Sequence, residues 1–294
     1  MMPTRSDPGR AAPLDDRVRW DTYGRGGLPA VFSHANGFPS RAYAPFLGRL
    51  TGLQIHAVHM RPTWPGIGAP PRRRDWNLHA DDLIAFIEHA FDEPVLAIGH
   101  SMGATCTALA AARRPDLFHG LVMIEPASVG AGLALACRLL PKALMARMQP
   151  AKGTLRKADT WPSREAFLSY CRRFKGYGQF DEEAFAALAA HGVEDLPDGR
   201  VALVFPKDWE AHNYTQPPSA SAVLRAFEMP CVAIRGRPSL FLGDSLWHDW
   251  KARAPATCFL EDTRFGHLLP LEAPRACADL VRRGLAEASS SRAR

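Results

Sequence analysis

Short hydrophobic runs alternate with helical patterns along most of the chain. The runs carry mainly aliphatic side chains and lack strict alternation of polar and apolar positions, which is typical of strands buried on both faces of a parallel sheet. They comprise residues 30–34, 55–59, 95–99, 121–125, 232–235 and 258–261. Residues 17–23 do alternate in polarity, which predicts an outer antiparallel strand.

Helical patterns fill the segments between these runs. Residues 77–91 place Leu83, Ile84, Ile87 and Phe91 on one face. Residues 102–114 are rich in alanine, and residues 272–287 form an amphipathic pattern near the end. Strand and helix in alternation predict an α/β fold, with a mostly parallel sheet of about seven or eight strands flanked by helices.

The alternation stops between residues 127 and 226, where the pattern is mainly helical. We interpret this stretch as an inserted helical cap, because such insertions cover a pocket at the carboxyl edge of a parallel sheet. The core domain is then expected at residues 15–126 and 227–288. The polar ends, residues 1–14 and 289–294, are expected to be disordered.

Composition indicates a globular chain that works in a reducing compartment. Among 294 residues, 47% are hydrophobic and 22% charged. No apolar run approaches the roughly 20 residues that cross a bilayer, and the first residues lack the apolar core of a secretory signal. The six cysteines form no C-x-x-C pair and read as buried free thiols. We expect a cytoplasmic protein with no membrane partner.

The chain carries an excess of basic residues, with a net charge of +6. The densest runs are residues 72–74 and 291–294, and the remaining arginines are scattered. Nucleic-acid proteins concentrate such charge on one element with base-stacking aromatics. We therefore expect a solvated basic surface and no nucleic-acid partner, and a preference for anionic substrates stays open.

A G-x-S-x-G sequence lies at the end of one predicted strand. It spans Gly99-His100-Ser101-Met102-Gly103, after the apolar residues 94–98 and before the helical residues 104–113. A sharp strand-to-helix turn needs small residues on both sides of a nucleophile, because larger side chains would collide there. The pattern predicts Ser101 as a nucleophile. The alternative is an ordinary serine at a helix N-cap.

A serine hydroxyl needs a base within hydrogen-bond reach. His267 follows the last predicted strand and precedes the final helix, so its loop can lie over the nucleophile. We predict His267 as the base, with a surface histidine as the alternative. His100 lies inside the turn itself, and we expect it to support the nucleophile by packing beside it.

A loop after the first hydrophobic run suits an oxyanion hole. Residues 33–39 include Asn36-Gly37, and small residues let a backbone amide approach a ligand. We expect the Met102 and Asn36 amides to hold the oxyanion and His34 to hold the loop. The alternative is a plain Asn-Gly turn.

These three motifs, in this order, resemble the α/β-hydrolase superfamily in its capped branch. The resemblance covers residues 16–287 and is most specific at residues 34–39, 99–103 and 266–272. It implies a Ser-His-acid triad, no metal and no organic cofactor. The serine argues against the branches of the superfamily that use an aspartate nucleophile.

The acid departs from the pattern of the superfamily. Ser239 occupies the usual place of the aspartate, and a serine cannot carry the charge that stabilises an imidazolium. Glu125 ends the strand after the nucleophile helix, where some superfamily members place their acid, and we favour it. Asp244 on the usual loop is the alternative, although it also looks like a first helical residue. A site without either acid is the third possibility.

The motifs predict hydrolysis of a small acyl substrate, namely a carboxylic ester, thioester or lactone, through an acyl-enzyme on Ser101. Two alternatives stay open: hydrolysis of a carbon–carbon bond in a diketone, and a non-catalytic ligand-binding protein. In the cap, Leu139, Leu140, Leu144 and Met148 line an acyl pocket or only pack the cap onto the core.

Overall fold

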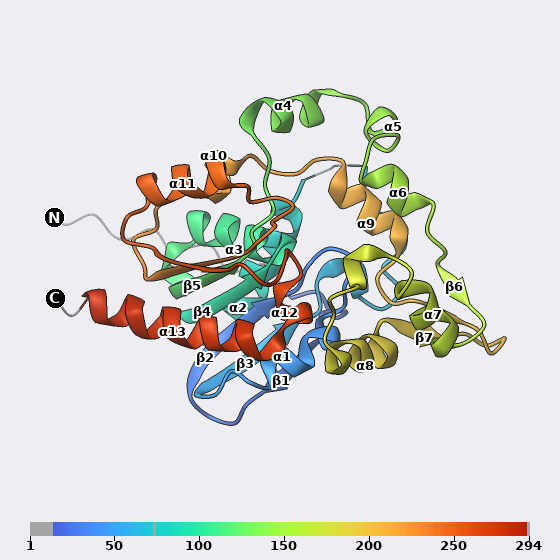
Figure 1. Cartoon of the computed structure of the whole chain (residues 1–294), viewed down its shortest axis with the longest axis horizontal. Coiled ribbons are helices and arrows are strands. Elements are labelled where there is room, and N and C mark those ends of the chain that lie inside the picture. Colours follow the sequence, from blue (N-terminus) through green and yellow to red (C-terminus); the bar gives the residue numbers. More distant parts are fainter. Residues whose placement is uncertain (1–13, 73–74, 293–294) are drawn as a thin grey trace, which may run out of the picture.

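The computed structural model describes residues 14–72 and 75–292, and its centre is one seven-stranded sheet (Figure 1). The strand order is β1-β3-β2-β4-β5-β9-β10. Only β1 runs antiparallel, against β3, and the other neighbours are parallel. The strands are β1 (Trp20–Tyr23), β2 (Leu28–Ser33), β3 (Leu53–Val58), β4 (Val95–His100), β5 (Phe118–Ile124), β9 (Cys231–Gly236) and β10 (Cys258–Asp262). The predicted fold class is confirmed.

Helices cover both faces of this sheet, because successive strand residues point to opposite faces. In β4, Val95 and Ala97 face one apolar cluster, and Leu96 and Ile98 face the other. The first cluster is closed by α2 (Asn77–Ala90), α3 (Met102–Arg113) and α11 (Asp244–Arg253). The second is closed by α1 (Ala44–Leu47) and α13 (Pro274–Arg292). Strands that are apolar on both faces therefore appear in the sequence as continuous hydrophobic runs.

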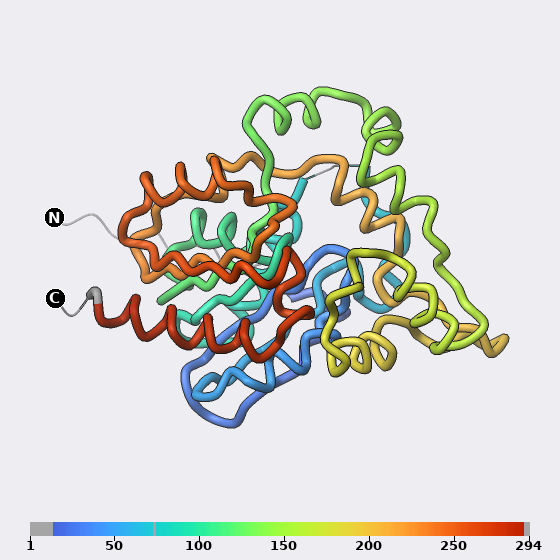
Figure 2. The backbone as a smooth tube through the Cα atoms, viewed as in Figure 1, coloured from blue at the N-terminus to red at the C-terminus, as the bar shows by residue number. Residues whose placement is uncertain are grey.

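The predicted cap region, residues 127–226, is not wholly helical. Its helices are α4 (Ala131–Leu139), α5 (Lys142–Met145), α6 (Ala151–Leu155), α7 (Arg164–Cys171), α8 (Glu182–His191), α9 (Lys207–Tyr214) and α10 (Ala220–Val223). It also holds a three-stranded antiparallel sheet, in the order β6 (Thr160–Trp161), β8 (Val201–Leu203), β7 (Val193–Asp195). Figure 2 shows the backbone leaving the core after β5 and returning through the orange segment before β9. Strands of two or three residues are too short to give a periodic signal in the sequence.

The chain is ordered further toward its end than the polar sequence predicted. Helix α13 runs to Arg292, so residues 289–292 are helical and not disordered. The Ser289 and Ser290 hydroxyls donate hydrogen bonds to the backbone carbonyls of Leu285 and Ala286, one turn earlier. Leu14, also expected to be disordered, packs against the core. Residues 1–13 and 293–294 lie outside the described residues.

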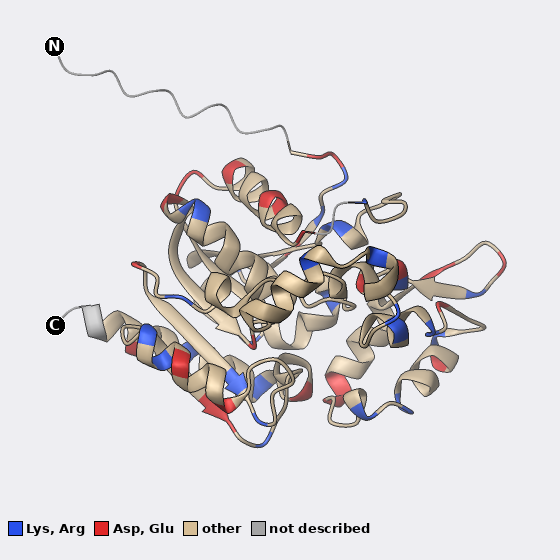
Figure 3. Cartoon of the chain, turned by 90° about the horizontal axis from the view of Figure 1, so that it is seen from above, with Lys and Arg blue, Asp and Glu red and all other residues tan. Residues whose placement is uncertain are grey.

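The cysteines of the chain are mostly buried. All six cysteines are free and five are buried, as predicted. In the part of the chain that the structure describes, no helix is long and apolar enough to span a membrane. The same residues contain no group of three or more His, Cys, Asp or Glu side chains suited to a metal ion. Basic and acidic residues are interspersed over the face seen in Figure 3.

Candidate active site

The predicted site residues meet at the carboxyl edge of the main sheet. Asn36 follows β2, Ser101 follows β4, and Glu125 follows β5. Ser239 follows β9 and His267 follows β10. Because parallel strands place their carboxyl ends at one edge, five loops far apart in sequence lie together there.

Ser101 lies in a strained turn between β4 and α3. Its φ is 53° and its ψ is −117°, a backbone conformation that is rare for a residue with a side chain. A Cβ on Gly99 would lie 2.5 Å from the backbone nitrogen of Ala104, and one on Gly103 would lie 2.1 Å from the Ser33 carbonyl oxygen. The turn therefore requires small residues on both sides, as the sequence predicted. The Ser101 side chain makes no capping hydrogen bond, which argues against the N-cap alternative.

Three buried side chains form a hydrogen-bonded row. The Ser101 Oγ lies 2.9 Å from His267 Nε2, and His267 Nδ1 lies 2.8 Å from Glu125 Oε2. An ionised carboxylate only accepts hydrogen bonds, so Nδ1 carries the proton and Nε2 accepts from the serine hydroxyl. The exposed fractions are 6% for Ser101, 7% for His267 and 0% for Glu125. The row is thus shielded from water along its length.

The Glu125 carboxylate is held by donors from the loop after β9. The Gly236 amide donates to Oε1 at 2.7 Å, and the Ser239 hydroxyl donates to Oε2 at 2.5 Å. Glu125 itself has a φ of 51°. Ser239, which stands where the superfamily usually has its acid, is therefore a hydrogen-bond donor to a carboxylate that comes from the neighbouring strand.

Asp244, the alternative acid, lies elsewhere. It is the first residue of α11, as its sequence context indicated. Its carboxylate pairs with Arg235 at 2.9 Å and Arg237 at 3.6 Å. The structure thus brings Glu125, and not Asp244, to His267.

His100 joins the nucleophile turn to two other loops. Its Nε2 lies 2.8 Å from the His267 carbonyl oxygen and must donate to it, so its Nδ1 accepts from the Tyr43 hydroxyl at 2.8 Å. That hydroxyl also accepts a hydrogen bond from the Ala35 amide. Complete burial lowers the pKa of His100 to about 3 and keeps the ring neutral. His100 therefore supports the site through hydrogen bonds as well as packing.

His34 holds the loop after β2. Its Nδ1 donates to the Ala35 carbonyl, and its Nε2 accepts from the Met60 amide, each at 3.0 Å. Burial lowers its pKa to about 3. These two hydrogen bonds tie the His34 ring to the loop after β2 and to the segment after β3.

Asn36 is fixed by the cap through its side chain. Its Nδ2 donates to the Glu210 carbonyl at 3.0 Å, and its Oδ1 accepts from Asn213 Nδ2 at 2.9 Å. Its backbone amide and that of Met102 have no hydrogen-bond partner within residues 14–72 and 75–292. Asn36, Met102 and Ser101 line the same cavity, so both amides are available beside the serine.

That cavity, the Ser101 cavity, has a volume of about 410 Å³ and lies between core and cap. Its wall is mostly apolar and includes Phe38, Trp76, Met102, Val129, Leu133, Cys137, Met145, Met148, Leu240, Phe241 and Leu268. From the sequence it was open whether four cap residues line an acyl pocket or only pack the cap onto the core, namely Leu139, Leu140, Leu144 and Met148. Only Met148 is among the lining residues. Leu139 is instead 73% exposed. Lys157 also lines the cavity, with its ammonium bonded to Glu210.

The sequence matches a known family over most of its length. The model of the alpha/beta hydrolase family matches residues 30–280. The chain belongs to the alpha/beta hydrolase family. Among solved structures, this hydrolase resembles E-2-(acetamidomethylene)succinate hydrolase, with a TM-score of 0.73, 21% identity and coverage of 92% of this chain and 94% of that one. The thioesterase domain from the curacin biosynthetic pathway gives a TM-score of 0.69, 16% identity and coverage of 90% and 94%.

Two curated relatives are similar in sequence. The type I acyl-CoA thioesterase mpaH' of Penicillium brevicompactum is 27% identical over 211 residues, which cover 65% of this chain and 43% of that protein. The lipase LipV of Mycobacterium tuberculosis is 26% identical over 235 residues, which cover 75% of this chain and 80% of that protein. The alpha/beta hydrolase chain thus spans less than half the length of the thioesterase.

Two residues of this alpha/beta hydrolase site were not recognised from the sequence. Tyr43 contacts His100 across 57 positions, and Asn213 contacts Asn36 across 177. No local pattern marks either residue, because each acts through one long-range hydrogen bond. Glu210 links the cap to the loop after β2: its carboxylate binds Lys157, and its carbonyl accepts a hydrogen bond from Asn36.

Proposed function

We propose that the protein hydrolyses carboxylic esters or thioesters of small acyl groups through an acyl-enzyme on Ser101. The observation that carries the proposal is the buried hydrogen-bonded row from Ser101 through His267 to Glu125. It lies at the floor of an apolar cavity large enough for an acyl chain. A serine, a base and an orienting carboxylate in hydrogen-bond contact are the arrangement that nucleophilic catalysis requires.

The chemistry starts at the Ser101 hydroxyl. His267 Nε2 takes its proton while Oγ attacks the carbonyl carbon of the substrate. The tetrahedral intermediate carries its negative charge on the former carbonyl oxygen, where the Asn36 and Met102 amides donate hydrogen bonds. The intermediate collapses with cleavage of the C–O or C–S bond, and His267 returns the proton to the leaving oxygen or sulfur.

Water completes the cycle. His267 removes a proton from a water molecule, which attacks the acyl-enzyme, and the second tetrahedral intermediate releases the acid and restores Ser101. In both halves the imidazolium is stabilised by the Glu125 carboxylate. The Gly236 amide and Ser239 hydroxyl hold that carboxylate in place by donating hydrogen bonds to it.

The substrate class rests on the wall of the Ser101 cavity. Methionine, leucine and aromatic side chains favour an apolar acyl chain, because they remove its surface from water. The relatives named as an acyl-CoA thioesterase and a lipase support the proposal at the level of ester and thioester hydrolysis.

Rapid-mixing kinetics with 4-nitrophenyl esters of two to ten carbons would test the acyl-enzyme. We expect a burst of one equivalent of nitrophenolate per protein molecule, followed by slower turnover. Ser101→Ala is expected to abolish the burst while the protein stays folded by circular dichroism. A folded wild-type protein that hydrolyses neither these esters nor matching thioesters would contradict the proposal.

A further inference from the structure

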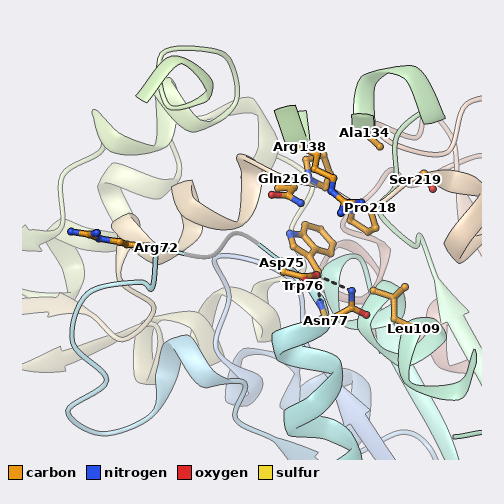
Figure 4. Close-up of a pocket in the computed structure, with 11 residues that line it drawn as sticks. Arg72, Asp75, Trp76, Asn77, Leu109, Ala134, Arg138, Gln216, Pro218 and Ser219 are labelled. Carbon is orange, nitrogen blue, oxygen red and sulfur yellow. Dashed lines mark hydrogen bonds between the residues drawn. The ribbon is translucent and has the colours of Figure 1, made fainter. Parts of the chain in front are cut away.

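A second cavity adjoins the Ser101 cavity, and its wall is more polar. It has a volume of about 640 Å³ and is lined by Arg72, Asp75, Trp76, Asn77, Leu109, Ala134, Arg138, Gln216, Pro217, Pro218 and Ser219 (Figure 4). We refer to it as the Arg138 cavity. Trp76 and Pro217 line both cavities, so the two spaces share part of their wall.

Helix α4 forms a wall of both cavities. Leu133 and Cys137 line the Ser101 cavity, and Ala134 and Arg138 line the Arg138 cavity. Residues four apart lie on the same face of a helix, so each pair forms one stripe and the two stripes are adjacent. A molecule lying beneath α4 would therefore pass from an apolar space beside Ser101 to a polar space beside Arg138.

Arg138 is the charged group best placed to bind a ligand there. It is exposed and forms no ion pair with any residue that the structure describes. Figure 4 places it beside Gln216 and Pro218. Asn77 and Ser219 add further polar groups to the wall.

The two other charged residues of the lining contribute less. The Asp75 carboxylate accepts hydrogen bonds from the Asn77 amide and Nδ2, at 2.9 and 2.8 Å, so its charge is partly compensated. Arg72 extends away from the other labelled side chains in Figure 4. Among the lining residues that the structure describes, Arg138 is therefore the cation that faces the cavity without a charged partner.

We propose that the Arg138 cavity binds a phosphate on the leaving group of the substrate. This rests on the proposed function, because it assigns the acyl chain to the Ser101 cavity and the leaving group to the polar space next to it. An apolar chain gains little from a polar wall, whereas an anion gains a charge-assisted hydrogen bond from a guanidinium. The substrate class is then an acyl thioester of a phosphorylated thiol.

A matched pair of thioesters isolates the phosphate. S-hexanoyl pantetheine and S-hexanoyl 4′-phosphopantetheine differ only in that group, so the ratio of their kcat/KM values measures its contribution. We expect the wild type to prefer the phosphorylated substrate by about tenfold, the effect of one charge-assisted hydrogen bond. The preference should weaken as salt is added, because the arginine is open to solvent.

Variants then test the assignment to Arg138. Arg138→Gln should bring the ratio close to one, and Arg138→Glu should reverse it. Arg147→Gln is the matched control, because Arg147 is an exposed cap arginine that lines neither cavity. It should keep the wild-type ratio despite the same change in net charge.

The outcomes separate this inference from the proposed function. A ratio near one in the wild type, or the same ratio in Arg138→Gln, would overturn the subsite while hydrolysis of pantetheine thioesters still supported the acyl-enzyme. Failure of every ester and thioester would overturn both. A second pair of substrates, S-hexanoyl 3-mercaptopropionate and the corresponding amide, differs only in a carboxylate. If Arg138 is needed for a preference in this pair and not in the first, the cavity binds a carboxylate instead of a phosphate, and the proposal as stated is overturned.

Discussion

The core and the cap contribute to the same cavity in different ways. The core supplies Ser101, His267 and Glu125, each buried and joined to the next by a hydrogen bond. The cap supplies apolar side chains such as Leu133 and Met145, which line the cavity through packing contacts. The core side of the cavity is thus fixed by hydrogen bonds, whereas the cap side is defined mainly by the shape and apolarity of its side chains.

The difference extends to the backbone. Ser101 and Glu125 are the only non-glycine residues with positive φ in the described part of the chain, and both directly follow central strands of the sheet. Such strain persists only where the surroundings hold it in place. In the cap, Leu133 is 52% and Leu135 is 56% exposed. We infer that the core determines the reaction and that the cap determines which substrates reach it.

The largest expected effect on kcat comes from the Glu125 carboxylate on the core side of the cavity. Glu125→Gln removes the charge that stabilises the His267 imidazolium, and we expect kcat to fall about 10³- to 10⁴-fold. The matched control is Asp244→Asn, which removes an exposed carboxylate that binds Arg235 and should leave kcat within a few-fold of the wild type. Steady-state kinetics on a nitrophenyl ester measures both. Equal losses in the two variants would remove the distinction between these acids.

A rescue experiment sharpens the assignment. The Ser239 hydroxyl lies 2.5 Å from Glu125 Oε2, which in turn lies 2.8 Å from His267 Nδ1. An aspartate at position 239 can therefore present a carboxylate to the same ring. We expect Ser239→Asp in the Glu125→Gln background to recover at least about tenfold of the lost kcat, because the buried imidazolium regains an opposite charge. No recovery in a folded double variant would contradict this geometry.

Ser239 itself should have a smaller effect. Ser239→Ala removes one hydrogen bond to the buried Glu125 carboxylate, and we expect kcat to fall about tenfold, the effect of losing a bond to a charged group. Ser239→Thr keeps the hydroxyl and should restore most of the rate, which a loss of packing alone would not predict. An alanine variant with unchanged kcat would show that the Gly236 amide is sufficient.

Buried histidines of the core make stability depend on pH. Burial lowers the pKa of His34 and His100 to about 3 and that of His79 to about 4, from 6.5 in the unfolded chain. Below pH 6.5 the unfolded chain binds protons that the folded chain excludes, so stability falls as pH falls. Well below pH 6.5 each histidine contributes up to about 1.4 kcal/mol per pH unit, and the contribution of His79 fades first, as pH approaches 4. Urea unfolding across this range measures the slope, and a flat profile would argue against neutral buried rings.

The smallest effect is expected in the cap. Met145→Trp enlarges a side chain that lines the Ser101 cavity and should shorten the preferred acyl chain, with changes in relative kcat/KM of about three- to tenfold. Leu139→Trp is the matched control, since Leu139 lies outside the lining and is mostly exposed. Its chain-length profile should match that of the wild type. A shift in the control alone would reverse the assignment of the cap residues.

The sequence was most informative where one local segment determines both structure and chemistry. The turn at Ser101 and the loop of His267 each follow a hydrophobic strand, so their position at the sheet edge could be predicted. Glu125 was favoured through the resemblance to the superfamily, and the observed strand order explains its position, because β5 lies between β4 and β9. Asp244 stayed open, because no pattern shows that its carboxylate binds two arginines.

The cap was less predictable for physical reasons. Its apolar helix at Ala131–Leu139 is amphipathic, but periodicity does not tell which residues meet the cavity and which face solvent. The sequence left open whether Leu139 lines the pocket or packs the cap onto the core, whereas Leu133 and Cys137 line it. Long-range bonds such as Tyr43 to His100 leave no trace in either local segment.

The most direct test of the account is covalent labelling of the nucleophile. A fluorophosphonate reacts only with a serine whose neighbouring base accepts its proton, so it reports the Ser101–His267 pair and not the substrate. Mass spectrometry of the digested protein is expected to find one adduct, on the peptide that contains Ser101, and none in folded His267→Ala. A folded wild-type protein without label at Ser101, or with undiminished label in the His267 variant, would contradict the central claim.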